Sequence, residues 1–82
     1  MKFLDVHHGM KGITQDQLQS EHRRDTDIER DFGVHFEKAW ADPETGEVFC
    51  MSEAPSKDAV QRVHTNAGHP ADEIYELQIS VD

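Results

Sequence analysis

The stretch Glu47–Glu53 constrains the fold most, because it is typical of a short β-strand that follows a tight turn. Its central residues, Val-Phe-Cys-Met, are apolar or sulfur-bearing, and the preceding residues 42–46, Asp-Pro-Glu-Thr-Gly, are a turn signal. Strand side chains point alternately to two faces, so Cys50 lies on the face opposite to Phe49 and Met51. One face therefore suits a core, and the face with the only cysteine could hold a soft ligand.

The remaining segments predict three more strands and two helices. Thr14 with Gln17 three residues later is a capping-box pattern that predicts a helix start, and Gly68 followed by Pro70 predicts a helix stop. We expect strands over Phe3–His7, Val34–Trp40 and Ile74–Val81, and helices over Thr14–Asp31 and Ser56–Ala67. The order β-α-β-β-α-β predicts one α+β domain over residues 1–82 with the ferredoxin-like fold, a four-stranded antiparallel sheet with both helices on one face.

Apolar and polar residues alternate along these strands, and we expect the apolar side chains of each strand to face the helices. The predicted core is Leu4, Val6, Leu18, Ile28, Val34, Phe36, Trp40, Phe49, Met51, Val60, Val63, Tyr75, Leu77, Ile79 and Val81. The opposite, open face then carries Asp5, His7, His35, Glu37, Cys50, Ser52, Glu76, Gln78 and Ser80. Because the first and third strands are central in this fold, these polar side chains should be neighbours across the sheet.

Imidazole, thiolate and carboxylate groups on one face are the ligand types of a borderline divalent ion such as Ni²⁺, Zn²⁺ or Cu²⁺. We predict His7, His35 and Cys50 as direct ligands, with Asp5 and Glu37 as oxygen ligands or as partners that orient the imidazoles. A single histidine is more often solvated or hydrogen-bonded, and a single cysteine is more often a small buried apolar residue. The metal hypothesis therefore depends on the convergence of these side chains.

The other histidines divide between a second cluster and simpler roles. The last strand should run antiparallel to the first, so the loop with His69 should lie near His7 and His8 and could form a second metal cluster. His64 shares a helix face with Val60 and Val63 and is interpreted as a half-buried, hydrogen-bonded side chain. His22 lies in a highly charged segment and is expected to be solvated.

Composition narrows the function further. The net charge of −9 disfavours nucleic acid as a partner, and no run approaches the roughly 18 apolar residues of a membrane span. The single cysteine and the lack of a visible secretory signal favour the cytoplasm. No nucleophile-elbow, phosphate-binding or dinucleotide-binding motif occurs, so we expect a protein that is not an enzyme. A chain of 82 residues buries little surface, so oligomerisation would help it.

Four segments carry a family resemblance. They are residues 5–7 (Asp-Val-His), residues 33–43 with Gly-Val-His-Phe and Ala-Trp-Ala-Asp-Pro, residues 48–55 (Val-Phe-Cys-Met-Ser-Glu-Ala-Pro), and residues 63–74 with Val-His and Ala-Gly-His-Pro-Ala-Asp-Glu-Ile. The chain resembles, over essentially its whole length, the small actinobacterial-type nickel-binding proteins, a family of otherwise unknown function. The resemblance implies a ferredoxin-like fold, a homodimer and nickel binding in the cytoplasm.

Three functions remain open from the sequence. The main hypothesis is a dimeric protein that binds nickel, or zinc or copper, for sequestration, delivery or sensing. The alternative is a dimeric small-molecule enzyme that uses Cys50 or a histidine in a cavity on the sheet face. A third possibility is an interaction module whose polar sheet face is its dimer interface.

Overall fold

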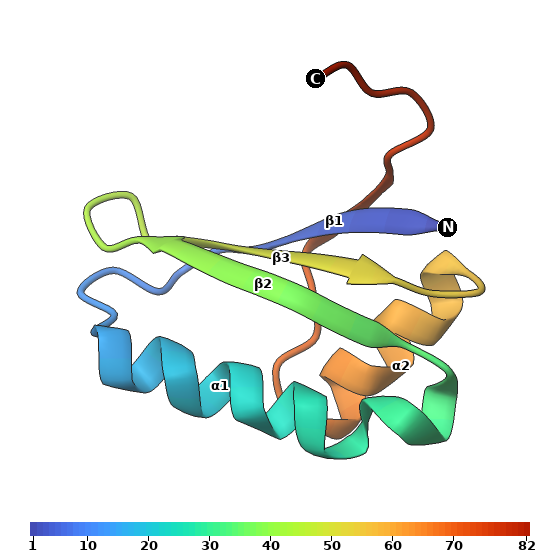
Figure 1. Cartoon of the computed structure of the whole chain (residues 1–82). Coiled ribbons are helices and arrows are strands. Elements are labelled where there is room, and N and C mark those ends of the chain that lie inside the picture. The colour runs from blue at the N-terminus through green and yellow to red at the C-terminus, as the bar shows by residue number, and fades with distance from the viewer.

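The computed structural model describes all residues from 1 to 82 and contains four strands and two α-helices (Figure 1). In chain order the elements are β1 (Lys2–His7), α1 (Gln15–Ile28), the short 3₁₀ helix η1 (Glu29–Phe32), β2 (His35–Asp42), β3 (Glu47–Glu53), α2 (Lys57–Asn66) and β4 (Glu73–Glu76). The sheet has the strand order β2-β3-β1-β4 with antiparallel pairing throughout, and both helices cover one of its faces. The predicted ferredoxin-like α+β fold is confirmed.

Side-chain caps set the starts of both helices. Thr14 Oγ1 accepts a hydrogen bond from the backbone N–H of Gln17 at 3.2 Å, and Thr14 N donates to Gln17 Oε1 at 2.9 Å. Ser56 Oγ accepts from the backbone N–H of Ala59 at 3.1 Å in the same way at the start of α2. These contacts satisfy backbone donors that have no partner within the helix, as the sequence predicted.

The orientation of the central strands is opposite to the prediction. β1 and β3 direct toward the helices the side chains of Phe3, Asp5, His7, Val48, Cys50 and Ser52, all of which are buried. Leu4, Phe49 and Met51 lie on the open face and are only half-buried. The side of the sheet that faces the helices therefore carries Asp5, His7, Cys50 and Ser52, which were expected on the open face. Burial of Asp5 and His7 is tolerated because these two side chains contact each other and Asp5 also contacts His64 of α2.

A β-bulge in β2 changes which of its residues face the helices. The register with β3 shifts between Phe36 and Lys38, so Phe36 lies opposite Ser52 but Trp40 lies opposite Phe49. A bulge inserts one unpaired residue and thereby reverses the alternation beyond it. Phe36 is buried as predicted, whereas Trp40, a predicted core residue, is exposed on the open face.

The last strand is shorter than predicted. β4 pairs with β1 only from Glu73, opposite Val6, to Glu76, opposite Phe3. Beyond Glu76, Leu77 N still donates to Lys2 O at 2.8 Å, and residues 78–82 pair with no strand. The tail leaves the sheet (Figure 1), and the predicted core residues Ile79 and Val81 are 95% and 98% exposed.

The apolar core lies between the sheet and the helices. It includes the predicted residues Val34, Phe36, Val60 and Val63, together with Phe3, Ile13, Val48, Cys50, Ala54 and Ala59, which were not in the predicted set. Leu18 and Ile28 of α1 pack against it, as expected. Neither helix is long and apolar enough to cross a membrane.

Candidate metal centre

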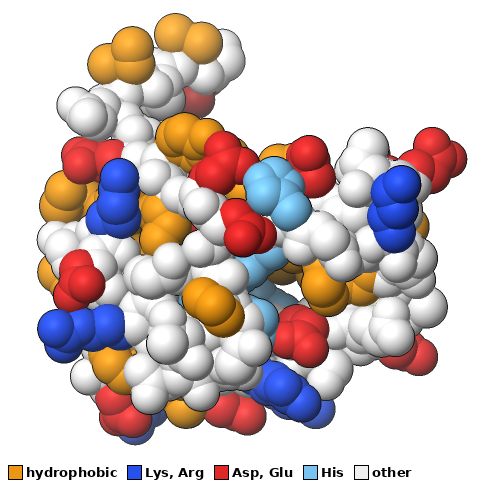
Figure 2. Space-filling model, turned by 180° about the vertical axis from the view of Figure 1, so that it is seen from behind, with side chains coloured by type: hydrophobic (Ala, Val, Ile, Leu, Met, Phe, Trp, Pro, Cys, Tyr) orange, Lys and Arg blue, Asp and Glu red, His pale blue; other side chains and the backbone are white.

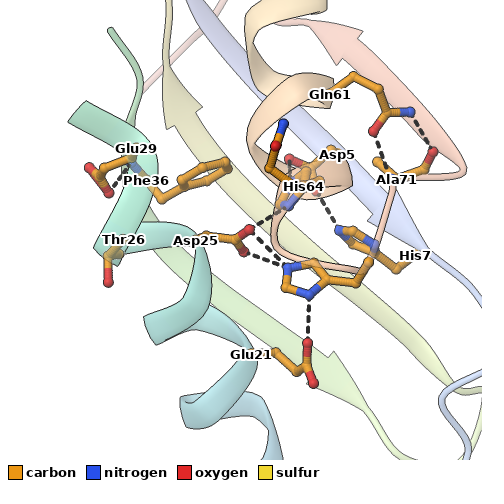
Figure 3. A network of polar contacts seen from close by, with 12 residues as sticks. Asp5, His7, Glu21, Asp25, Thr26, Glu29, Phe36, Gln61, His64 and Ala71 are labelled. Carbon is orange, nitrogen blue, oxygen red and sulfur yellow. Dashed lines mark hydrogen bonds and ion pairs between the residues drawn. The ribbon is translucent and has the colours of Figure 1, made fainter. Parts of the chain in front are cut away.

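A network of buried histidines and carboxylates lies between the sheet and the helices (Figure 3). β1 contributes Asp5 and His7, α1 contributes Asp25, α2 contributes His64, and the loop after α2 contributes His69. Asp5 and His64 have no solvent exposure, and Asp25 is 1% exposed. These residues come from segments that are far apart in the sequence, so the fold itself assembles the cluster.

His64 connects the two halves of the network. Its Nε2 lies 2.9 Å from Asp5 Oδ2, and its Nδ1 lies 2.9 Å from Asp25 Oδ1. Asp5 also contacts His7, whose Nε2 is 3.0 Å from Oδ1. Asp25 also contacts His69, whose Nε2 is 2.8 Å from Oδ1 and 2.9 Å from Oδ2. Each carboxylate therefore lies between two imidazoles.

The network reaches the protein surface through His69 and Glu21. His69 Nδ1 lies 2.6 Å from Glu21 Oε2, which makes an ion-pair contact, although the angle is outside the range of a hydrogen bond. The loop with His69 is held by Gln61, whose side-chain amide accepts from Ala71 N and donates to Ala71 O, both at 2.8 Å. The His69 ring is thus fixed from both its loop and its carboxylate partners.

The two carboxylates favour a charged His64. Burial by itself lowers the pKa of His64, but the hydrogen bonds to Asp25 and Asp5 outweigh it and raise this pKa to about 9. Both ring nitrogens of His64 then donate, one to each aspartate.

The aspartates respond in the opposite direction. Burial raises the pKa of Asp5, yet its hydrogen bonds with His64 and His7 bring that pKa below the usual value. Burial likewise raises the pKa of Asp25, and hydrogen bonds with His64 and His69 bring it below the usual value. The cluster therefore combines ionised carboxylates with a cationic imidazole, a combination that compensates for burial of each charge.

Cys50 lies beside this network without being ionised. Burial, together with the negative charges of Asp5 and Asp25, raises the pKa of its thiol. The side chain belongs to the apolar core as well as to the polar cluster.

Two groups of side chains could hold a metal ion, and they share His64. One consists of Asp5, His7, Cys50 and His64, and the other of Asp25, His64 and His69. Within each group the ligand atoms lie within 4.8 Å of one another.

A cavity of about 40 Å³ lies next to both groups. One water molecule needs roughly 10–15 Å³ on this measure, so the space suffices for water or a small ion beside the ligands. Its lining combines six apolar side chains, Cys50 among them, with the polar side chains of His7, Glu21, His22, Asp25 and His69. Figure 2 shows a hollow on this side of the molecule, with histidine side chains visible at its bottom.

The structure brings some of the predicted ligands together and separates others. Asp5, His7 and Cys50 adjoin one another as predicted, although on the helix side of the sheet. The expectation that His35 and Glu37 lie beside them is wrong. The His35 side chain is 73% exposed and contacts Glu29, and Glu37 forms an exposed ion pair with Lys2. The bulge in β2 and the inverted sheet faces account for this separation.

The structure also separates His69 from His8, which were expected to lie close together. His69 lies near His7, with ring centroids 5.7 Å apart, as the antiparallel last strand led us to expect. His8 instead lies at the surface, where its Nε2 is 2.6 Å from Glu73 Oε2. The two histidines thus have different carboxylate partners and different exposure.

Sequence reasoning missed the central residue of the cluster and its helical partners. His64 is hydrogen-bonded as expected, but it is fully buried and has two partners rather than one. Asp25 was overlooked, although its spacing from Leu18 and Ile28 places it on the inner face of α1, which a search for polar residues at helical spacing would have found. His22 was expected to be solvated, but its Nδ1 is buried and has no hydrogen-bond partner.

Comparisons with known proteins give one family and one solved structure. A family model described as "Nickel responsive protein SCO4226-like" matches residues 3–77. The crystal structure of SCO4226 from Streptomyces coelicolor A3(2) is similar to this chain, with 57% sequence identity and a TM-score of 0.97. The match covers 99% of this chain and 100% of the other. A search of the curated proteins gave no significant match.

Proposed function

Because the chain belongs to the SCO4226-like family of nickel-responsive proteins, we propose that it binds Ni²⁺ through Asp25, His64 and His69. The resemblance read from the sequence motifs is confirmed by this membership. The observation that carries the ligand assignment is the position of His64, whose two ring nitrogens face carboxylates on opposite sides.

The outer carboxylates support this ligand set. When His64 Nδ1 binds an ion together with Asp25, its Nε2–H remains free to donate to Asp5 at the 2.9 Å separation already present. When His69 Nε2 binds the ion, its Nδ1 keeps the ion-pair contact with Glu21 Oε2 at 2.6 Å. Metal-binding histidines usually direct their second nitrogen at a carboxylate, which fixes the ring and makes the ligating nitrogen more basic. Both histidines of this group have such a carboxylate, and in the ion's absence a proton on His64 takes its place.

The group that contains Cys50 is the weaker candidate for nickel. Thiolates favour softer or more thiophilic ions such as Cu⁺ and Zn²⁺, whereas imidazole and oxygen ligands suit Ni²⁺. Both groups reach the cavity, which has room for water as a further ligand. Asp25 and His69 line it from one group, and His7 and Cys50 line it from the other. In this proposal Asp5 and His7 orient His64, and Cys50 fills the core beside them.

The proposed role is reversible binding of nickel for sequestration, delivery or sensing, with no catalytic step. Zn²⁺ and Cu²⁺ can use the same nitrogen and oxygen ligands, so the ion bound in a cell depends on availability as well as on the site. The net charge of −9 attracts any of these cations.

The proposal includes a homodimer formed through the open face of the sheet. This face carries the exposed side chains of Trp40 and Tyr75 beside the half-buried Leu4, Phe49 and Met51. Apolar and aromatic side chains gathered on one surface are typical of an interaction site. The alternating apolar residues of the exposed tail, Leu77, Ile79 and Val81, add further apolar surface to such a contact.

Isothermal titration of the tag-free apo-protein with Ni²⁺ tests the metal site. We expect saturable binding of Ni²⁺ and none of Ca²⁺, which requires oxygen ligands only. His69→Ala should weaken the binding strongly, whereas Cys50→Ala should leave the nickel affinity as it is. Weak, non-saturating binding by the wild-type protein would contradict the proposal. Loss of binding in Cys50→Ala with retention in His69→Ala would move the ion to the thiol-containing group.

A further inference from the structure

Of the proposed ligands, His64 and Asp25 are shielded from solvent, whereas the His69 side chain is 19% exposed and lines the cavity together with Asp25. Asp5 and His64 have no exposed surface, and Asp25 is 1% exposed, so an ion from solvent cannot meet these side chains directly. Asp25 and His69 both line the cavity. On its helix side it is lined by Glu21 and His22 of α1. The hollow in Figure 2 shows histidine side chains inside an otherwise mixed polar and apolar surface.

His22 is the one polar side chain of this cavity that the network leaves unused. Its Nδ1 is buried and has no hydrogen-bond partner, although burial of a polar atom without a partner usually costs about 1–3 kcal/mol. A residue that only covered the surface could direct this nitrogen to water. A ring nitrogen that has no partner in the protein and lies beside a cavity is instead available to a metal ion that passes through it.

From this arrangement we propose that the cavity is the entry route for nickel and that His22 is a transfer ligand on it. In this role His22, assisted by the negative charge of Glu21, binds the incoming ion briefly and passes it to Asp25 and His69. His22 and Asp25 lie three residues apart on α1, and therefore on the same side of the helix. The transfer ligand His22 and the proposed final ligand Asp25 are thus neighbours on one face of α1.

Charge and ligand type both suit such a route. Glu21 and Asp25 place two carboxylates among the mostly apolar side chains that line the cavity, and negative charge between low-dielectric walls raises the local concentration of cations and their rate of association. Glu21 is in contact with His69, so the carboxylate at the entrance is also a neighbour of the final ligand. Because this role presupposes the nickel site proposed above, its test must separate the rate of binding from the affinity.

Stopped-flow kinetics of the apo-protein with Ni²⁺ provide this separation, with an indicator dye reporting free nickel and a chelator reporting release. His22→Gln removes the imidazole and keeps a polar side chain, and His22→Asn keeps a polar group near the position of Nδ1. We expect both variants to take up Ni²⁺ about ten-fold more slowly, the lower end of what charge and cleft effects contribute to association rates. Release should slow in the same proportion, because a route residue affects both directions and leaves Kd unchanged. His35→Gln, at an exposed histidine outside the cavity, is the matched control and should keep the wild-type rates.

Three outcomes would overturn the inference. Wild-type rates in both His22 variants would show that the ion does not use this residue. Weaker affinity with faster release would make His22 a ligand of the final site rather than of the route. A loss of thermal stability without any change in either rate would make its role structural. Absence of nickel binding by the wild-type protein would instead overturn the metal site and the route together.

Discussion

His64 is the centre of the buried network because its ring contacts a carboxylate on each side. Its contacts with Asp5 and Asp25 join the sheet to α1 across the core, and no solvent reaches the ring. A buried charge that loses its only partner is strongly destabilising, but each charge in this network has two partners. The stability of the apo-protein should therefore depend on the protonation of this one side chain.

We predict that the apo-protein is most stable between about pH 4 and pH 6.5. The pKa of His64 rises from 6.5 to about 9 on folding, so its contribution is fully present below pH 6.5 and is lost as the pH rises through 9. This rise corresponds to about 3 kcal/mol at 1.36 kcal/mol per unit. The lowered pKa values of Asp5 and Asp25 contribute stability above their usual value of 3.8, which is lost as the pH falls further.

Urea unfolding of the apo-protein across this pH range measures the effect. His64→Gln, which cannot be charged, should flatten the alkaline limb of the profile while lowering the stability at pH 6. An alkaline limb that is the same in the wild type and in His64→Gln would show that the proton on His64 does not stabilise the fold.

A second prediction at this scale concerns Asp5, which is not a ligand in the proposed site. Asp5→Asn keeps the shape of the side chain but replaces the carboxylate beside His64 Nε2 by an amide. Loss of an outer carboxylate of this kind usually lowers metal affinity by about 10–100-fold. Titration calorimetry with Ni²⁺ should show this loss while circular dichroism shows an intact fold. Unchanged affinity would mean that His64 is not oriented by Asp5 when the ion is bound.

At the scale of elements, the hairpin between β2 and β3 holds the loop that follows β1. Met10 N donates to Gly46 O at 2.8 Å, and Gly12 N donates to Pro43 O at 3.0 Å. Gly46 has a φ of 82°, and a Cβ placed there would lie 2.7 Å from Lys11 N. Met10 lines the cavity, so this contact also positions one wall of the candidate site.

Gly46→Ala should therefore lower the free energy of unfolding by at least about 2 kcal/mol, since it adds a backbone clash to the cost of a positive φ. Gly12→Ala is a matched control, because Gly12 has a φ of 80° and open space where its Cβ would lie. That variant should lose only about 1–2 kcal/mol, the cost of the backbone conformation alone. Chemical unfolding of both variants measures the difference. Equal losses would show that the loop adapts to the extra methyl group without cost.

The strands show which part of the fold could be predicted from the sequence. Turn and cap residues such as Thr14 and Gly46 determine where elements begin and end by local chemistry, and the order of elements followed from them. The faces of the sheet did not follow, because alternation identifies two faces without saying which one is buried. Asp5 and His7 are polar by type, yet the contact with His64 makes the burial of Asp5 favourable. His64 in turn contacts Asp25, and both residues come from helices distant in the sequence.

The candidate site was predictable to the same limited extent. Asp5, His7 and Cys50 converge because strand pairing places Asp5 opposite Cys50, a register that the order of elements indicates. His35 was misplaced because a β-bulge after Phe36 has no clear sequence signal here. Asp25 and His64 required knowledge of how α1 and α2 lie against the sheet, which is a property of tertiary packing.

At the scale of the whole molecule, the two faces of the sheet differ in the side chains that they carry. The helix side contains the ionic network, and the open side carries the apolar side chains that alternation had assigned to the core. A small protein with an uncovered apolar sheet face gains stability when a second copy covers it. The exposed apolar tail beyond β4 extends the surface available for that contact.

We predict that Met51→Glu converts the protein from a dimer to a monomer. Met51 lies on β3 on the open face, opposite Leu4 of β1 and Lys38 of β2, and a carboxylate there would have to leave water to face the apolar side chains of a second copy. Gln19→Glu, an exposed position on α1, adds the same charge on the opposite side of the molecule and should leave the dimer intact. Light scattering after size-exclusion chromatography measures the mass of each variant. The ligands of the proposed nickel site lie on the helix side of the sheet. The Met51→Glu monomer should therefore bind as many Ni²⁺ ions per chain as the wild-type protein. A monomeric wild-type protein would remove the interface, whereas loss of nickel binding in a folded Met51→Glu monomer would show that the site is completed by the second copy.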